Sequence, residues 1–300
     1  MIKVSYIKSD DRIYNIERCL ALIKSEITLG LKNATRIVVK PCCPVANNQL
    51  AATHVEALFA VINFIQPFVK SQITLASNTG SDDTMTAFKN YGYFDLQDKF
   101  DLAIVDLNTD EFEEVELSST DTSKFSVKIA NTLTQSDYII SIAPPKTDNL
   151  VNFAGSIKNV VPDLQFHQSN NSFWDRIFSS DKNPSSNDGK ELKLIHENIL
   201  KLYQKIPLKL SVLDGFEVMA GDGPVDGEMV AAHFAIAGTN PTAVDWLACK
   251  CLGIPVDAVG YLSLLEQKEN MNYFVAGDEW QKHVLDIKMP QNYDKNRQWQ

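Results

Sequence analysis

The chain has 300 residues, 44% of them hydrophobic, and a formal net charge of -10 at pH 7. This length can bury a full core, and the acidic balance argues against general nucleic-acid binding, which needs a basic surface. The sequence starts MIKVSYIKSDD, without the apolar core of a signal peptide, and no apolar run reaches the length of a membrane span. Its five cysteines do not form the pattern of a secreted disulfide framework. We therefore expect a cytoplasmic protein with no nucleic-acid or membrane partner.

The first hundred residues alternate between short apolar runs and helical patterns. The predicted strands are residues 2–7, 36–39, 73–76 and 102–107. Helices are predicted between them, and Thr53 with Glu56 forms a capping-box pattern at the start of one. The loop that starts at Asn78 would point backbone N–H groups at an anionic ligand, although most such loops are simply turns.

The central stretch, YIISIAPPKTDNLVNFAGSIKN, starts at Tyr138 and carries two lysines. Residues 138–143 are apolar without a polar face, as in a strand that is covered on both sides of a parallel sheet. Pro144 and Pro145 end that strand, and Lys146 follows at the position where open α/β sheets bind ligands. Lys158 and Asn159 come after a short apolar segment. This stretch predicts an anion-binding site, with two solvated surface lysines as the alternative.

Residues 112–117 and 125–129 alternate polar and apolar side chains, which predicts an antiparallel ribbon at an edge. Residues 163–189 are polar and rich in Ser, Asn and Asp, so we interpret them as an insertion or lid. Residues 208–213 are a further buried strand that is expected to end at Asp214, followed by the glycine-rich loop 221–228. Together these patterns predict one α/β domain over residues 1–300, with a mostly parallel sheet, helices on both faces and small antiparallel edge additions.

The lysines at the predicted strand ends form the candidate cationic set. Lys40, Lys146 and Lys158 can bind a carboxylate or a phosphate, and a desolvated lysine can act as a base. We assign catalytic roles to Lys146, Lys158 and Asp214. The expected ligand-binding residues are Lys40, Thr147, Asp148, Asn159, Gly221, Asp222, Gly223 and Asp245.

The acidic residues of the loop offer oxygen ligands, but their spacing is not that of a calcium-binding loop. A tight turn is the favoured interpretation, and we assign no metal ligand while leaving a divalent metal open. Cys42, Cys43, Cys249 and Cys251 have poor spacing for zinc, and we interpret them as small buried apolar residues.

Five segments in order resemble the bacterial and archaeal family known as domain of unknown function 362. They are VVKP from Val38, THVEAL from Thr53, DYIISIAPPKT with SIKN from Asp137, VLDGFEVMAGDGPVDGE from Val212, and TNPTAVDWLACKCLGI from Thr239. Longer members often carry an iron–sulfur module, which would imply redox work, but this chain has no CxxCxxC run and we do not expect that cofactor. The family is also similar, at the level of fold, to the N-terminal domain of nickel-pincer lactate racemases.

The chain departs from the family pattern at two positions. Cys42 stands where members usually have Asn, and Asp148 stands where they usually have His. The resemblance leads us to expect an enzyme that acts on a small anionic metabolite at a lysine-lined cleft. The alternative is a non-catalytic binding protein that keeps the pocket and has lost the chemistry of the histidine. The cofactor and homo-oligomerisation stay open.

Overall fold

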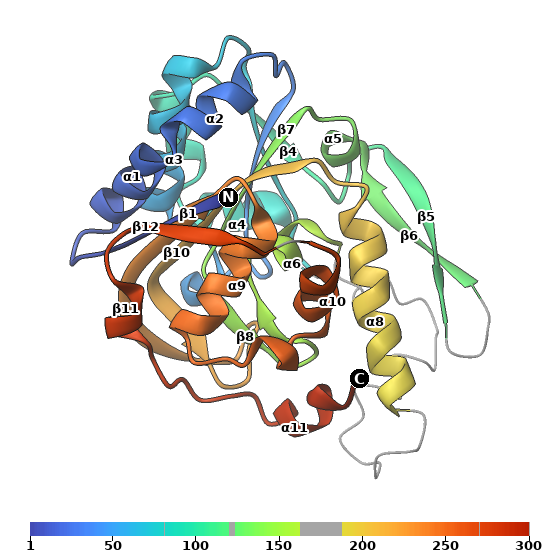
Figure 1. The fold of residues 1–300 in the computed structure, drawn as a ribbon. Helices are drawn as coiled ribbons and strands as arrows, with labels where there is room; N and C mark the ends of the chain where they lie inside the picture. Colours follow the sequence, from blue (N-terminus) through green and yellow to red (C-terminus); the bar gives the residue numbers. More distant parts are fainter. Residues whose placement is uncertain (81, 120–123, 163–187, 270, 300) are drawn as a thin grey trace.

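The computed structural model describes residues 1–80, 82–119, 124–162, 188–269 and 271–299 (Figure 1). Ten of its strands form one sheet, in the order β12-β1-β11-β10-β7-β2-β3-β4, with β8 and β9 attached to the side of β10. The strands of this sheet are β1 (Ile2–Lys8), β2 (Ile37–Pro41), β3 (Ile73–Ser77), β4 (Leu102–Asp106), β7 (Tyr138–Ala143), β8 (Lys146–Asp148), β9 (Asn152–Ala154), β10 (Leu208–Ala220), β11 (Glu228–Gly238) and β12 (Tyr273–Gly277).

The sheet is mostly parallel, as the sequence predicts. β10, β7, β2, β3 and β4 pair in parallel with one another in that order, and β1 is parallel to β12. β11 is antiparallel to both β1 and β10. The strands that contain Lys40 and Asp214 therefore flank β7, and all three run in the same direction. Because parallel strands joined by crossovers have their carboxyl ends on one side, the segments after β2, β3 and β7 meet at one edge of the sheet.

Helices cover both faces of the sheet, and each face has its own hydrophobic cluster. The first face carries α1 (Arg12–Leu22), α2 (Lys24–Leu31), α3 (Val55–Ile65) and α4 (Thr84–Asn90), and the second carries α6 (Ser156–Val160), α8 (Asp188–Tyr203), α9 (Pro241–Cys251) and α10 (Gly260–Lys268). The short helix α5 (Asn131–Thr134) adds Leu133 to the cluster of the second face, and the short helix α11 (Tyr293–Asn296) lies near the C-terminus (Figure 1). This arrangement confirms the predicted fold class.

A separate antiparallel ribbon is formed by β5 (Phe112–Ser118) and β6 (Lys124–Ala130), in agreement with the alternating pattern of the sequence. It lies beside α8 (Figure 1), where the amide of Asn198 bonds the backbone of Ser118. The predicted polar insertion lies outside the described residues from 163 to 187. Its last two residues belong to α8.

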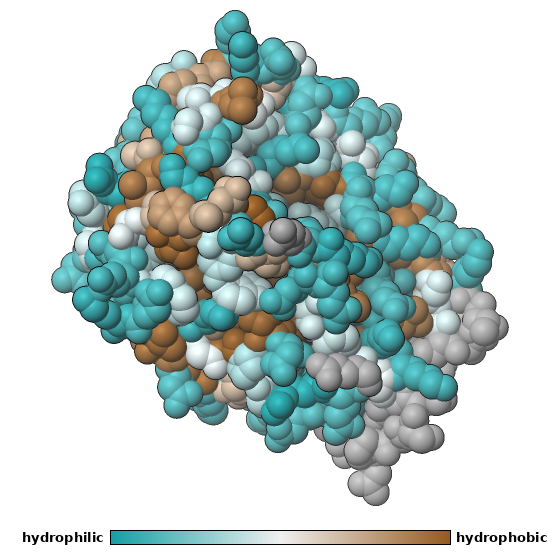
Figure 2. Space-filling view, viewed as in Figure 1, coloured by the Kyte–Doolittle hydropathy of each residue, from teal (hydrophilic) through white to brown (hydrophobic). Residues whose placement is uncertain are grey.

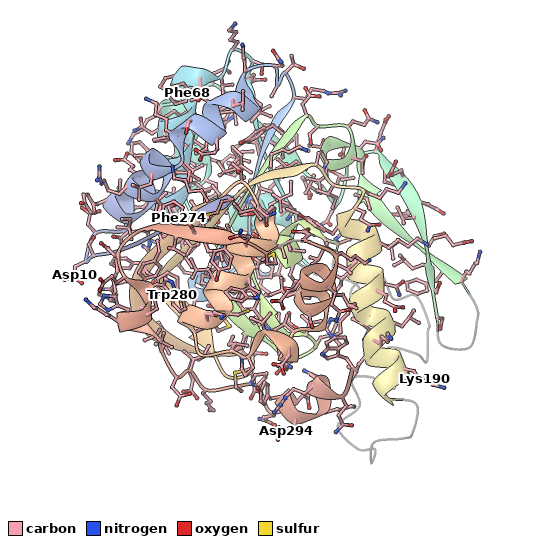
Figure 3. All side chains as sticks on the ribbon, viewed as in Figure 1. Asp10, Phe68, Lys190, Phe274, Trp280 and Asp294 are labelled. Atoms are coloured by element: carbon pink, nitrogen blue, oxygen red, sulfur yellow. The ribbon has the colours of Figure 1, made fainter. Side chains whose placement is uncertain are left out.

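One stretch of the described chain, Gln49–Phe68, is long and apolar enough to cross a membrane by length and composition alone. Its main part is α3, which packs its apolar residues into the core of the first face. Most of the face seen in Figure 2 is hydrophilic, with apolar residues in smaller areas. Charged side chains such as Asp10, Lys190 and Asp294 project outward around the molecule (Figure 3). The one apolar candidate segment among the described residues is therefore a helix of the core.

The predicted capping box at Thr53 is wrong. His54 is the N-cap of α3, and its Nδ1 accepts a hydrogen bond from the backbone N–H of Glu56. The hydroxyl of Thr53 instead donates to the backbone carbonyl of Ile142 and accepts from the N–H of Cys42. The Thr53 side chain is therefore bonded to backbone groups at the ends of two neighbouring strands, and it does not cap the helix.

Candidate functional site

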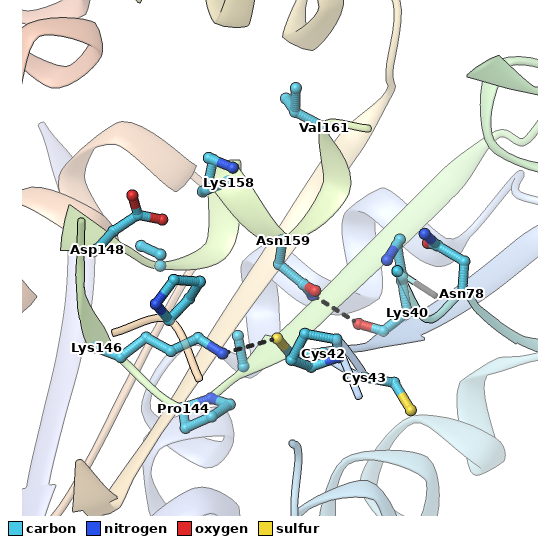
Figure 4. A pocket seen from close by; sticks show the side chains of 16 residues that line it. Lys40, Cys42, Cys43, Asn78, Pro144, Lys146, Asp148, Lys158, Asn159 and Val161 are labelled. Atoms are coloured by element: carbon cyan, nitrogen blue, oxygen red, sulfur yellow. Dashed lines mark hydrogen bonds between the residues drawn. The ribbon is translucent and has the colours of Figure 1, made fainter. Parts of the chain in front are cut away.

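A cavity opens at the edge of the sheet where β2, β3 and β7 end. It has about 650 Å³ of space between protein atoms, including the part open to solvent. Its wall contains three cations (Lys40, Lys146 and Lys158) and one carboxylate (Asp148), and we call it the lysine cavity. The rest of the wall is Cys42, Cys43, Pro44, Asn78, Gly80, Ala143, Pro144, Ala154, Gly155, Asn159, Val161 and Pro224 (Figure 4).

Lys40 is the fourth residue of β2, inside the strand rather than beyond it, and it is 5% exposed. Within the described ranges, no acceptor lies within hydrogen-bond distance of its Nζ. Burial lowers the pKa of this lysine to about 8, and the thiols of Cys42 and Cys43 act against that shift. The backbone carbonyl of Lys40 accepts a hydrogen bond from the Asn159 side chain at 3.0 Å. Lys40 therefore brings a buried cation without a bonded acceptor to the cavity.

Lys146 starts the short strand β8 instead of lying in a loop, and it is 3% exposed. Its Nζ donates to the backbone carbonyl of Ala51 at 2.7 Å and lies 3.4 Å from Sγ of Cys42 (Figure 4). These contacts hold the ammonium group at the cavity wall, between the segment after β2 and the segment before α3.

Asp148 ends β8, at the position where the family resemblance led us to expect histidine. Its Oδ1 accepts hydrogen bonds from the backbone N–H groups of Leu150 and Val151, at 2.8 and 3.0 Å. The carboxylate thus stabilises the turn between β8 and β9 while it also lines the cavity. Thr147, the residue before it, does not line the cavity; its hydroxyl donates to the carbonyl of Met219 in β10.

Lys158 and Asn159 reach the cavity from α6, whose position depends on Asp245. The buried carboxylate of Asp245 accepts hydrogen bonds from the N–H and hydroxyl groups of Ser156, both at 2.7 Å, and from the N–H of Ile157 at 3.0 Å. Burial raises the pKa of Asp245 to about 6, and these hydrogen bonds oppose that shift. Asp245 is not a wall residue, so the prediction that it binds ligand gives way to a role in holding α6.

Asp214 lies away from the lysine cavity, and the prediction that its strand ends there is wrong. β10 continues to Ala220, and Asp214 pairs with Ala235 of β11. A glycine at this position is typical of a turn, but Gly215 lies within the strand. It provides space for the ring of Phe234, because a Cβ there would lie 2.2 Å from that ring.

The carboxylate of Asp214 belongs to a different cluster on the molecule. Nε of Arg12 lies 3.1 Å from its Oδ2, and the same guanidinium group contacts Glu217 at 3.2 Å. Burial raises the pKa of Asp214 to about 6, although Arg12 opposes this shift. Asp214 lines a small cavity with His54 and Pro144, and the catalytic role beside Lys146 and Lys158 is not supported by its position.

The glycine-rich loop between β10 and β11 contributes only Pro224 to the lysine cavity. Asp222 instead accepts two hydrogen bonds from Gln291, both at 2.9 Å. Gly221 has a φ of +79°, and Gly223 packs so closely on Thr147 that a Cβ would lie 2.0 Å from its carbonyl oxygen. The predicted ligand-binding roles of Gly221, Asp222 and Gly223 are therefore replaced by turn formation and close packing.

A second cavity adjoins the first, and it shares Lys40, Asn78, Gly80 and Val161 with it. Lys128 of the β5–β6 ribbon lines this second cavity, where its ammonium group also stacks over the ring of Phe112. Lys40 is the lysine that the two cavities share.

Sequence reasoning missed the part that Cys42 and Pro224 play in the wall. Cys42 follows Lys40 by two residues in an extended segment, so both side chains point to the same side. This spacing could have predicted that Cys42 lines the cavity with Lys40. Pro224 has no comparable signal, because its position depends on how the β10–β11 connection folds back. Among the residues that the structure describes, no group of three or more His, Cys, Asp and Glu side chains has the arrangement to hold a metal ion.

The fold and the cavity define an α/β protein with a lysine-lined pocket at the carboxyl edge of its parallel strands. Residues 37–250, more than two-thirds of the chain, match the family described as Domain of unknown function (DUF362), and the chain belongs to this family. This match confirms the resemblance that its motifs indicate.

A search of the curated proteins found no match. Among solved structures, the chain is similar to the lactate racemase apoprotein from Thermoanaerobacterium thermosaccharolyticum, with 14% sequence identity and a TM-score of 0.46. That similarity covers 78% of this chain and 54% of the other, so the chain spans about half the length of that protein.

Proposed function

We propose that the chain is a cytoplasmic enzyme that binds a small carboxylate- or phosphate-bearing metabolite in the lysine cavity. The observation that carries this proposal is the ammonium group of Lys40, which is buried and has no acceptor within the described residues. A buried charge is stable only when it is paired, and an anionic group of a ligand would supply the missing partner. Three lysines against one carboxylate give the wall the matching charge.

The same lysine is suited to proton transfer. Its pKa of about 8 lies close to physiological pH, where a general acid or base is most effective. Lys146 and Lys158 would then hold the anionic group, and Asn159 would position Lys40 through its backbone carbonyl. The five cysteines are buried and free, in keeping with a reducing cytoplasm.

A second function, non-catalytic binding of the same class of ligand, is favoured by Asp148. Its carboxylate oxygen is already occupied by two backbone N–H groups of the β8–β9 turn, so it is held for a structural role. In this case the pocket retains its lysines and has lost the step that a histidine at position 148 would serve.

We expect that Lys146→Met weakens anion binding about tenfold or more, because it removes a charge from the wall and keeps the length of the side chain. Binding is measured as the rise in melting temperature with inorganic phosphate and with acetate, at constant ionic strength. Lys70→Met is the matched control, since Lys70 is exposed and lies outside the cavity. Equal shifts in the two variants would mean a general salt effect and would refute the site.

Asp148→His distinguishes the enzyme from the binding protein. If the histidine is what the pocket lacks, the variant gains turnover of small hydroxy or oxo acids, or takes up a metal, while the wild type shows neither. Turnover by the wild type, lost in Lys40→Met, supports the enzyme instead. Proton exchange at the carbon next to the carboxylate, followed by NMR in D₂O, is the measurement.

A further inference from the structure

The thiol of Cys42 lies in the lysine cavity beside a buried ammonium group. Its Sγ is 3.4 Å from Nζ of Lys146, and the residue is 9% exposed. Figure 4 shows the sulfur turned toward Lys146. Lys40, whose Nζ has no hydrogen-bond acceptor in the described part of the chain, lines the same cavity. Two ammonium groups thus line the cavity that this sulfur faces, and reactive cysteines occur in such electropositive, partly buried surroundings.

The adjacent thiol of Cys43 is in a different environment, although it also contributes to the cavity wall. Successive side chains of an extended segment point to opposite sides, and Cys42 and Cys43 pack in the hydrophobic clusters on opposite faces of the sheet. Figure 4 shows the sulfur of Cys43 pointing away from Lys146. Burial raises the pKa of Cys43 to about 12, so this thiol stays protonated. Cys43 therefore serves as an internal control for the reactivity of Cys42.

The charged groups around Cys42 are mostly positive. The titratable residues that act on it or share its cavity are Lys40, Lys146, Lys158, Cys43, Asp148, Tyr91 and Tyr93. Burial raises the pKa of both tyrosines, to about 12 for Tyr91, so these phenols are neutral. Two carboxylates oppose the lysines: that of Asp148, whose Oδ1 is bonded to two N–H groups, and that of Asp82, which acts on the adjacent Cys43 and accepts from the N–H of Ala46.

We propose that Cys42 is a nucleophile of the lysine cavity and adds to the carbonyl carbon of a small anionic aldehyde or 2-oxo acid. This inference rests on the proposed function, because the lysines that bind the anionic group bring the carbonyl next to the sulfur. It narrows the ligand from any small anion to one with a carbonyl group beside the acid.

The addition balances without another reactant. The thiolate sulfur supplies an electron pair, a C–S bond forms, and the π pair of the C=O bond moves to the oxygen. An ammonium group, that of Lys40 or Lys146, gives a proton to this oxygen. The products are a hemithioacetal and a neutral lysine; no group leaves, nothing is oxidised, and the reverse steps release the carbonyl compound.

The first test is alkylation of the intact protein with iodoacetamide at pH 7.5, followed residue by residue by peptide mass spectrometry. This reagent is neutral, so its reaction with Cys42 does not require anion binding. We expect Cys42 to react at least about tenfold faster than Cys43, because its sulfur lies beside an ammonium group while burial raises the pKa of Cys43 to about 12. In Lys146→Met, if the variant melts as the wild type does, the Cys42 rate falls about tenfold and its pH–rate curve moves to higher pH.

The second test uses glyoxylate, which carries an aldehyde, and glycolate, which has the same charge without a carbonyl group. Glyoxylate is expected to protect Cys42 from iodoacetamide at least about tenfold better than glycolate at equal concentration. Equal protection by the two acids would overturn the covalent addition. Equal rates at Cys42 and Cys43 would overturn the thiolate itself. A fast, Lys146-dependent Cys42 together with no protection by either acid would refute the proposed anion site and leave the thiolate standing.

Discussion

Replacing Lys40 with methionine is expected to make the ligand-free protein more stable. The ammonium group of Lys40 is buried without an acceptor among the described residues, and removing an uncompensated buried charge while keeping the side-chain volume stabilises a protein, by on the order of 1–4 kcal/mol. Urea unfolding of the two proteins at pH 7 measures the change in the free energy of unfolding. The exposed Lys70→Met serves as the control, with an expected change near zero.

The same lysine gives this prediction a pH dependence. Its pKa is lowered from 10.5 to about 8 in the folded chain, so between pH 8 and 10.5 the unfolded chain binds more protons than the folded one. Stability contributed by this group therefore rises with pH over that window, by about 3 kcal/mol in all. The gap between wild type and Lys40→Met is largest below pH 8 and closes above it. A pH-independent gap, or a Lys40→Met protein that is less stable at pH 7, would mean that Lys40 already has a partner.

Asp245→Ala is expected to have the largest destabilising effect, about 3–5 kcal/mol. The substitution leaves the N–H groups of Ser156 and Ile157 and the Ser156 hydroxyl buried without their acceptor. Because α6 carries Lys158 and Asn159, anion binding is also expected to weaken in the variant that remains folded.

Asp245→Asn keeps one oxygen and presents an N–H₂ group to the N–H of Ile157, so an intermediate loss of stability is expected. Chemical unfolding measures these changes, with Asp98→Ala, an exposed aspartate, as the control. A loss below about 1 kcal/mol for Asp245→Ala would show that α6 does not depend on this carboxylate.

Much of the fold could be predicted because its signals are local. The apolar run at residues 138–143 coincides with β7, and its lack of a polar face reflects burial on both sides of the sheet. Lys40, Lys146 and Lys158 line one cavity because crossover connections place the ends of parallel strands at one edge. This rule depends only on the order and direction of the strands, so it can be applied without knowing any side-chain contact.

The wrong predictions concern residues whose local sequence pattern is explained by contacts with distant parts of the chain. Gly215 resembles a turn residue, yet it continues a strand to make room for the ring of Phe234. The glycines and aspartates of the β10–β11 connection resemble a ligand loop, yet Asp222 bonds Gln291, which lies far along the chain. The contact of Lys146 with Cys42 joins residues 104 positions apart, and no spacing rule connects them.

The pairing of β1 with two strands from the C-terminal part of the chain determines when the sheet can close during folding. This strand lies between β11 and β12, with Val4 opposite Gly238 on one side and Val275 on the other. During synthesis the β1 segment is made before both of its partner strands, which follow more than two hundred residues later. Bringing such distant segments together costs chain entropy before any contact compensates it, so closure of this half of the sheet is a slow, late folding event. Until then the unpaired strand edges are open to pairing with another copy of the chain, which is the general hazard of late-closing sheets.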